Sequence, residues 1–405
     1  MPRRHPTDYL DCSAPLLEWV LIKQIDVEID QSSWLTPPLE IRHPLPTQLT
    51  NYPTNCDLDF LRALLWVGVL SIPVRIPRWW LAIRWAQVRY LGIVDDSSAR
   101  LRLHPAADDL DAHQKMVLSD DWGMGVALEW LSRTFSYSLL DHGASYLKRL
   151  EQQGLAIFQG PARRRGPRKC PDFVGVDASG RLHLIECKGN QQGRRALLAQ
   201  LADGRGQKQN VSFPDEGVFV GQRLVVGLAI APAWARGKTL LRVEDPPPER
   251  EQEHYTVTAA NVEVLSREVE IGALSRMLVL SGEAGLLARI LPDELEDFSR
   301  EDVADANPTR EHFTASDQEW VGRIDRMELP APIRIGERVV RSFEIRHGVS
   351  PVLLESLSRP RRREDLPGLL RGASLVPSET RQDARGNGYA AIRWGNSFIA
   401  DLSLH

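Results

Sequence analysis

The stretch "CPDFVGVDASGRLHLIECKG", residues 170–189, has the pattern of a β-hairpin, and the fold expected for the neighbouring segments depends on it. Two apolar segments, 172–176 and 181–188, flank a short loop at 178–180 that ends in glycine. Apolar segments of this length, joined by a loop that contains glycine, are typical of paired antiparallel strands. The sequence therefore predicts a hairpin here, with a strand register that depends on the length of the turn.

The register determines whether three charged side chains of the hairpin meet. A three-residue loop with glycine in the left-handed position is a common hairpin class, and it sets Asp172 opposite Glu186. Because side chains alternate along a strand, Glu186 and Lys188 then share the face of Asp172. A two- or four-residue loop would instead pair Asp172 with Ile185 and point the two acids to opposite faces.

Two acids that face each other across a β-ladder repel, so a counter-charge is expected between them. Mg²⁺ is a hard cation that commonly binds one or two carboxylates together with phosphate oxygens of a substrate. A lysine suits the third position because its compact ammonium can hold an attacking water and neutralise developing negative charge. The pattern of Asp172, Glu186 and Lys188 therefore favours metal-assisted phosphate chemistry over a surface ion pair.

The use of lysine at this position is itself informative. The chain has 50 lysines and arginines, of which seven are lysines. Lys188 is the only lysine that follows an acidic residue at a spacing of two. In a chain that otherwise prefers arginine, this pairing arises by accident less often than it would in a lysine-rich chain.

The pairs Pro171-Asp172 and Glu186-Lys188 resemble the PD-(D/E)xK signature of the restriction-endonuclease-like nuclease superfamily. The core of that family has the element order αβββαβ. The resemblance implies that Asp172 and Glu186 bind Mg²⁺, which Mn²⁺ can replace, with help from the Cys187 carbonyl. It also implies that Lys188 orients or activates the attacking water, in an endonuclease or exonuclease reaction.

The same resemblance points to supporting residues on two helices. The family often has an acid on the first helix, where Glu129 lies in this sequence, as a further catalytic residue and metal ligand. It often has a glutamine on the helix after the motif, matched by Gln207 or Gln200. The alternatives are a solvent-facing acid for Glu129 and ordinary polar surface for the two glutamines.

The elements expected around the hairpin follow the order of that core. A helix is expected to start at Ser119 or Asp120 and to reach Phe135. The other elements are a strand at 154–160, the hairpin, a helix after residue 190 that is interrupted or ended near Gly204 and Gly206, and a buried strand at 223–232. The order matches αβββαβ and predicts a mixed α/β fold.

Composition along the chain suggests three parts. Residues 1–112 are expected to form an N-terminal accessory domain, and residues 113–245 the nuclease-like domain. Residues 246–405 are expected to form a C-terminal accessory domain, with an acidic helical part followed by a β-rich tail. The proline-rich segment near residue 247 and the acidic turn near residue 108 mark the two boundaries.

The net charge of −4 hides an uneven distribution. Residues 161–210 carry about +7 and residues 251–310 about −8. A local basic surface is what binding to a nucleic-acid backbone requires, although a solvated charged face has the same composition. The residues expected to contact phosphates are Arg163, Arg164, Arg165, Arg168, Lys169, Arg194 and Arg195.

Several classes of protein are disfavoured. The longest apolar run, 63–74, is too short to cross a bilayer, and the first residues lack the pattern of a secretory signal, so a cytoplasmic location without membrane contact is expected. The four cysteines form no CxxC pair, which argues against structural zinc and a disulfide framework. No P-loop is present, so any NTP-driven step requires a partner NTPase or helicase.

The function expected from these features is metal-dependent hydrolysis of phosphodiester bonds, in DNA rather than RNA. Bacterial restriction, antiphage defence and DNA repair are the settings in which such modules occur, and double-strand cleavage would favour a homodimer. One alternative is a catalytically inactive nucleic-acid-binding or assembly subunit that keeps the nuclease-like fold. Another is a scaffold that binds a basic partner through the acidic residues 251–310.

Overall fold

The structure of the chain is a computed structural model. It describes residues 22–35, 43–70, 89–135, 137–160, 168–245, 254–259, 261–295, 310–335, 338–359, 363–370, 375–376, 381–382 and 388–405. Within these ranges the chain has a mixed α/β fold, as the sequence predicts, with two large sheets and one small sheet.

A central sheet of seven strands carries the hairpin, in the order β2-β1-β9-β8-β6-β5-β3. Its strands are β1 (Ile22–Ile29), β2 (Asn55–Asp59), β3 (Leu139–His142), β5 (Phe173–Val176), β6 (Leu182–Asn190), β8 (Val220–Ala229) and β9 (Leu240–Glu244). Strand β6 pairs antiparallel with β5 and parallel with β8. Both β6 and β8 are almost entirely buried, which explains the continuous apolar runs in their sequences.

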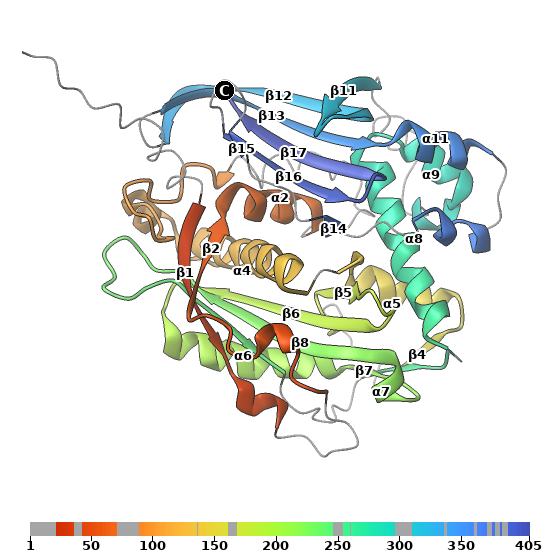
Figure 1. Cartoon of the computed structure of the whole chain (residues 1–405). Helices are drawn as coiled ribbons and strands as arrows, with labels where there is room; N and C mark the ends of the chain where they lie inside the picture. Colours follow the sequence, from red (N-terminus) through yellow and green to blue (C-terminus); the bar gives the residue numbers. More distant parts are fainter. Residues whose placement is uncertain are drawn as a thin grey trace, which may run out of the picture.

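Two helices cover opposite faces of the central sheet: α4 (Ala112–Phe135) lies above it and α6 (Arg194–Gln209) below it in Figure 1. Glycines allow both helices to approach closely. A Cβ at Gly189 of β6 would lie 1.8 Å from the Ser119 carbonyl oxygen of α4. A Cβ at Gly227 of β8 would lie 2.6 Å from Leu197 of α6.

Helix α2 (Phe60–Leu70) is buried along its whole length because it packs between α4 and the C-terminal sheet. Apart from Arg62, its sequence is apolar on all sides, as expected for a helix without a solvent face. A Cβ at Gly125 of α4 would lie 2.5 Å from the Ala63 carbonyl oxygen, so glycine is required where α2 and α4 touch. From top to bottom in Figure 1 the layers are the C-terminal sheet, α2, α4, the central sheet and α6.

The C-terminal sheet is antiparallel, in the order β11-β12-β13-β17-β16-β14, with β15 also paired to β16. Its strands are β11 (Glu311–Ala315), β12 (Gln318–Ile335), β13 (Arg338–Val349), β14 (Leu375–Val376), β15 (Arg381–Gln382), β16 (Gly388–Trp394) and β17 (Phe398–Leu404). Helix α8 (Val262–Leu280) contacts both this sheet and strands β3 and β5 of the central sheet.

A small sheet in the order β4-β10-β7 lies at the edge of the molecule, formed by β4 (Ala156–Gln159), β7 (Val211–Ser212) and β10 (His254–Val257). The remaining α-helices are α5 (Gly143–Gln152), α7 (Glu216–Phe219), α9 (Ala284–Ile290) and α11 (Pro351–Ser358). Short 3-10 helices are η1 (Gln31–Trp34), η3 (Thr47–Leu49), η4 (Pro105–Asp109), η5 (Pro292–Leu295), η6 (Arg363–Asp365) and η7 (Pro367–Leu369).

The described elements α4, β3, β5, β6, α6 and β8 follow one another in the order αβββαβ, with other elements inserted. The first strand of this series differs from the sequence expectation. The strand predicted at 154–160 forms as β4, but β4 pairs with β10 in the small sheet. The strand beside β5 is β3, which follows α4 directly.

Three expected boundaries also differ from the structure. Strands β1 and β2 extend the central sheet, so residue 112 does not separate one sheet from another. Helix α4 begins at Ala112, because the Asp111 side chain accepts a hydrogen bond from the Gln114 backbone N–H (2.8 Å) and caps the helix there. Helix α6 continues past both of its glycines to Gln209.

Among the described residues, no helix has both the length and the apolar character that crossing a bilayer requires.

Candidate active site

The hairpin between β5 and β6 has the register that the three-residue turn predicts. Phe173 is paired with Ile185. Extending the same register by one residue places Asp172 opposite Glu186. The turn is closed by a hydrogen bond from the Asp177 N–H to the Arg181 carbonyl oxygen (3.1 Å), and Gly180 has a φ of +83°. The prediction is therefore confirmed, and the alternative that pairs Asp172 with Ile185 is wrong.

Glu186 lies at the centre of the site with its carboxylate enclosed by protein. Its side chain has 0% exposure, and its Oε2 atom has no hydrogen-bond partner. Burial raises the pKa of Glu186 well above its usual value, and the negative charge of Asp172 raises it further, while Lys188 and a hydrogen bond from the Asp172 backbone lower it in part. A buried carboxylate that has one oxygen without a hydrogen-bond partner and lies next to a second acid is an environment that a bound cation would stabilise.

Asp172 is held by the backbone of the neighbouring strand. Its Oδ2 atom accepts a hydrogen bond from the Cys187 N–H at 2.8 Å. Burial raises the pKa of Asp172, while this hydrogen bond and the charge of Lys188 lower it. In a strand the N–H and C=O of one residue point to the same side, so the Cys187 carbonyl also faces the Asp172 side of β6.

Lys188 lies on the same face as Glu186 and forms an ion pair with its Oε1 atom. The lysine side chain keeps 22% exposure, so its ammonium group borders solvent. Burial lowers the pKa of Lys188, but the Glu186 carboxylate offsets this and the pKa is raised overall. The group therefore remains a protonated ammonium at neutral pH and can donate hydrogen bonds.

Helix α6 closes this face of the site. A Cβ at Gly204 would lie 3.0 Å from Lys188 Cε and 3.3 Å from Glu186 Cγ. Glycine at this position thus gives space to the two side chains, and it does not interrupt the helix as the sequence suggested.

Replacing Gly204 by alanine is expected to separate stability from activity. Alanine favours a helix over glycine by about 1 kcal/mol, whereas the added methyl group would displace the Lys188 ammonium by a few tenths of an ångström. We expect cleavage several-fold slower than in the wild type, with an unfolding temperature that does not fall. Thermal unfolding and initial cleavage rates measure both effects, and Gly217→Ala in α7, where the nearest atom lies 3.7 Å away, is the control.

The acid that α4 brings near the site is Asp120, and Glu129 lies elsewhere. Asp120 is exposed, but neighbouring atoms partly desolvate its carboxylate and raise its pKa. The positive charge of Lys188 acts in the opposite direction and lowers the pKa of Asp120. The charge of Asp120 in turn contributes to the raised pKa of Asp172. These mutual effects place Asp120 within electrostatic range of both residues.

Glu129 belongs to a different buried cluster. Its Oε2 atom lies 3.3 Å from Arg62 Nε and accepts a hydrogen bond from Trp66 Nε1 at 3.3 Å, both on α2. Burial raises the pKa of Glu129 to about 8, with Arg62 acting in the opposite direction. Its assignment as a catalytic residue and metal ligand is therefore wrong, because α4 turns it toward α2 and away from β6.

The two glutamines proposed on the helix after the motif have different outcomes. Gln200 accepts a hydrogen bond from the Asn190 side chain at 2.9 Å, near the end of β6. Gln207 lies in α6, but its side chain is outside the described part of the structure. The prediction for Gln207 therefore stays a prediction.

The basic residues predicted to contact phosphates are spread over several elements. Arg163, Arg164 and Arg165 lie outside the described residues. Arg168 forms an ion pair with Glu151 of α5 (2.8 Å), and its guanidinium lies over the ring of Phe158 in β4, 4.2 Å from the ring centroid. These contacts hold the side chain against α5 and the small sheet.

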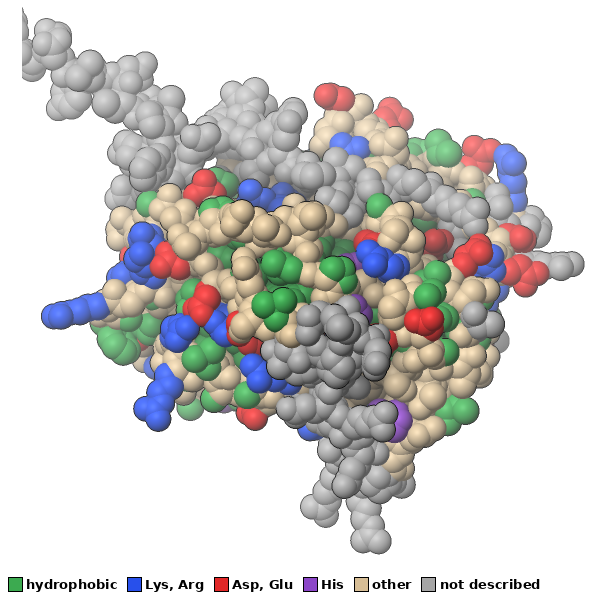
Figure 2. Space-filling model, turned by 60° about the horizontal axis from the view of Figure 1, so that its bottom comes forward, with side chains coloured by type: hydrophobic (Ala, Val, Ile, Leu, Met, Phe, Trp, Pro, Cys, Tyr) green, Lys and Arg blue, Asp and Glu red, His purple; other side chains and the backbone are tan. Residues whose placement is uncertain are grey.

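Of the other three predicted basic contacts, Lys169 precedes strand β5, and Arg194 and Arg195 begin helix α6. Lys169 immediately precedes Cys170 and accepts a hydrogen bond from Asn210 through its carbonyl oxygen (3.3 Å). Arg194 forms an exposed ion pair with Glu28 (2.7 Å), while Arg195 beside it is exposed. On the face shown in Figure 2, the described Lys and Arg side chains lie among Asp and Glu side chains.

Cys170 is a neighbour of the site that sequence reasoning did not assign. Burial raises the pKa of its thiol to about 12, and the charges of Asp172 and Glu186 contribute to the rise. The thiol is therefore protonated at neutral pH and is not a nucleophile. Its position two residues before Asp172 was the signal available in the sequence.

The candidate active site offers oxygen donors for a divalent cation. Within the described residues, no group of three or more His, Cys, Asp and Glu side chains is arranged to hold a metal ion. The site offers instead two carboxylates and a backbone carbonyl, which are the oxygen donors that Mg²⁺ uses when waters and substrate complete its shell. The unpartnered Glu186 Oε2 fits such an ion.

Comparisons of this chain with protein-family models, with curated proteins and with solved structures found no match.

Proposed function

We propose that this chain is a metal-dependent nuclease with a site formed by Asp172, Glu186 and Lys188. The observation that carries the proposal is the buried, unpartnered oxygen of Glu186, which lies opposite a second acid and beside a lysine. The element order around the hairpin supports it, because α4, β3, β5, β6, α6 and β8 follow one another along the chain in the order αβββαβ, with other elements inserted.

In this proposal Asp172, Glu186 and the Cys187 carbonyl hold Mg²⁺ or Mn²⁺. When bound, the cation would act as a Lewis acid on the scissile phosphate. Lys188 supplies the second positive charge: because its ammonium stays protonated, it orients the attacking water and neutralises the developing negative charge rather than accepting a proton. Asp120 acts in support, by holding the ammonium in place electrostatically.

The proposed substrate is DNA, in bacterial restriction, antiphage defence or repair, and the proposed location is the cytoplasm. An NTPase or helicase partner and a homodimer are the assemblies that would supply translocation and double-strand cleavage. The alternative is a catalytically inactive nucleic-acid-binding subunit. The specific observation in its favour is that the described residues hold no ready-made cluster of three metal-binding side chains.

A cleavage assay tests the proposal directly. Purified full-length protein is incubated with plasmid, linear duplex DNA, single-stranded DNA and RNA, with Mg²⁺, Mn²⁺ or EDTA. We expect cleavage of DNA with either cation and none with EDTA. Cleavage that persists in EDTA contradicts the metal site, and inactivity on every substrate with both cations favours the binding subunit.

Replacement of Asp120 by asparagine is expected to slow cleavage by about 10–100-fold, the usual effect of removing a residue that supports a metal site. The neutral side chain would no longer hold the Lys188 ammonium, whereas the shape of the residue is kept. Initial rates at several Mg²⁺ concentrations measure the effect. Glu129→Gln is the matched control on the same helix, and a larger loss for this variant than for Asp120→Asn would contradict the assignment.

A further inference from the structure

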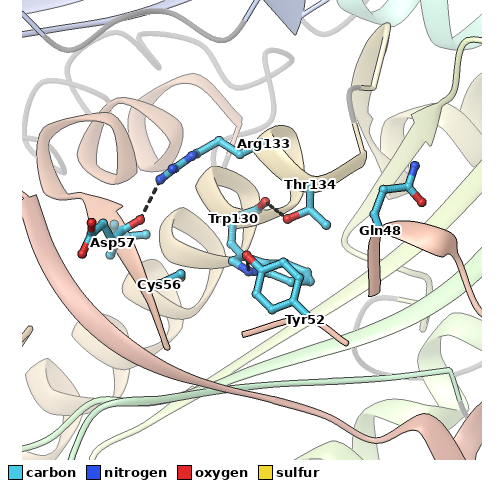
Figure 3. Close-up of a pocket in the computed structure, with 8 residues that line it drawn as sticks. Gln48, Tyr52, Cys56, Asp57, Trp130, Arg133 and Thr134 are labelled. Carbon is cyan, nitrogen blue, oxygen red and sulfur yellow. Dashed lines mark hydrogen bonds between the residues drawn. The ribbon is translucent and has the colours of Figure 1, made fainter. Parts of the chain in front are cut away.

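A pocket of about 300 Å³ opens on the other half of α4, between this helix and the edge strand β2 (Figure 3). Its lining residues are Gln48, Tyr52, Cys56, Asp57, Leu58, Trp130, Arg133 and Thr134. Ten residues of α4 separate Asp120 from Trp130, which corresponds to about 15 Å along the helix axis. The pocket is therefore distinct from the candidate active site.

Two aromatic rings form one wall of the pocket. The rings of Tyr52 and Trp130 meet edge to face, with their centroids 5.3 Å apart. Trp130 Nε1 donates a hydrogen bond to the Tyr52 hydroxyl at 2.8 Å, so the tyrosine ring is held in a fixed orientation. A rigid ring at the border of a pocket is a surface on which a planar ligand can stack.

The rim of the pocket supplies hydrogen-bond donors. Arg133 Nη1 donates to the Asp57 carbonyl oxygen at 2.7 Å and lies 4.0 Å from Glu129 Oε1. A guanidinium carries five N–H groups on three nitrogens. In the two contacts above, which involve described residues, Arg133 uses Nη1. Its Nε and Nη2 atoms can therefore donate to a ligand. The side chain is 47% exposed and borders the opening.

The remaining polar groups complete a set with both donors and acceptors. Gln48 is exposed on the side of the pocket opposite Asp57 (Figure 3). Its amide oxygen accepts a hydrogen bond from Thr47 Oγ1 (3.4 Å), and its amide NH₂ is a donor that a ligand can use. The Asp57 carboxylate points away from Tyr52 (Figure 3), because alternation along β2 turns Cys56 toward α4 and Asp57 outward. The pocket thus combines an aromatic ring, an arginine and a glutamine.

We infer that this pocket binds a single nucleobase, stacked on Tyr52 with its edge recognised by Arg133 and Gln48. Arginine and glutamine are the side chains that form paired hydrogen bonds with the edges of guanine and adenine, and aromatic rings stack unpaired bases. A volume of about 300 Å³ lies at the lower end for ligand pockets, which suits one ring system and excludes a base pair. The base could belong to a free nucleotide or to an unpaired position of a strand.

Binding measurements in EDTA test this inference independently of any cleavage. Isothermal titration calorimetry is carried out with GMP, AMP, CMP and UMP, and with a short unstructured DNA strand. We expect Arg133→Gln and Gln48→Ala to weaken binding by about tenfold or more, the loss expected for a paired hydrogen bond to a base edge. Arg289→Gln, an exposed arginine on α9, is the control and should bind as the wild type does.

The outcomes distinguish the sources of the base. Binding of mononucleotides that the two pocket variants weaken supports a free-nucleotide site, and binding of the strand alone with the same dependence supports an unpaired base within a nucleic acid. Absence of binding to every probe, or equal affinities for the pocket variants and Arg289→Gln, overturns the inference. Gln48 is exposed, so its alanine variant folds even where Arg133→Gln is destabilised. Because these measurements are made in EDTA, their outcome does not depend on the proposed nuclease activity.

Discussion

Replacement of Lys188 by alanine is expected to slow metal-dependent cleavage by a factor of about 10²–10³, the usual cost of removing one group that stabilises developing negative charge at the reacting centre. The ammonium group lies on the face of Asp172 and Glu186 and remains protonated because of the Glu186 charge. Its loss leaves the two acids in place but removes the positive charge that faces the phosphate. Single-turnover cleavage rates with saturating Mg²⁺ measure the effect.

Two further variants make this prediction specific. Lys238→Ala removes an exposed lysine that pairs with Asp26 at 3.2 Å, and we expect it to cleave at the wild-type rate. Lys188→Arg keeps the positive charge, but the planar guanidinium is larger than the space beside Gly204, so only partial activity is expected. If Lys188→Ala cleaves as fast as Lys238→Ala, the proposed site is wrong.

Replacement of Glu186 by glutamine is expected to stabilise the metal-free protein and to abolish both cleavage and stabilisation by divalent cations. The pKa of Glu186 is raised in the folded state above its ordinary value of 4.5, mainly by burial. The contribution of Glu186 to the free energy of unfolding is therefore fully present below pH 4.5. It is lost as the pH rises from there through the folded pKa, because the buried group must then ionise. Glutamine resembles the protonated acid, so at pH 7 the variant should be more stable by about 1–3 kcal/mol.

Denaturant unfolding between pH 4 and pH 8, with and without Mn²⁺, tests this prediction. The wild type should lose stability with rising pH more steeply than Glu186→Gln, and only the wild type should gain stability from Mn²⁺, because the cation binds the ionised carboxylate. Glu355→Gln on α11, an exposed glutamate paired with Arg359, is the control for the charge change. Equal stabilisation of both proteins by Mn²⁺ would falsify the assignment of Glu186 as a metal ligand.

The hairpin could be predicted because its determinants are local. Loop length, the left-handed glycine at position 180 and the alternation of side chains are set by neighbouring residues, and together they place Asp172 opposite Glu186. Helix α6 was predicted in position, but its glycines were interpreted as breaks. The reason for Gly204 is a contact with Lys188, from a strand earlier in the chain, which no local pattern contains.

The acid on α4 could not be chosen from the sequence. Asp120 and Glu129 are nine residues apart, which at 3.6 residues per turn puts their side chains on opposite sides of the helix, so only one of them can face the hairpin. In the structure α4 packs against α2 and β6 on different sides, and the close contact at Gly125 directs Glu129 toward Arg62. The burial of α2 against α4 thus decided which acid remained near the hairpin.

The sequence by itself determined the mixed α/β class, the hairpin and the convergence of Asp172, Glu186 and Lys188, because turn geometry and strand periodicity act over a few residues. Only the tertiary structure decided that β1 and β2 extend the central sheet, that β3 rather than β4 lies beside β5, and that a pocket forms between α4 and β2. Sheet order and helix packing depend on which buried surfaces fit together over long sequence separations. That fit is a property of the whole core, and local pattern contains little of it.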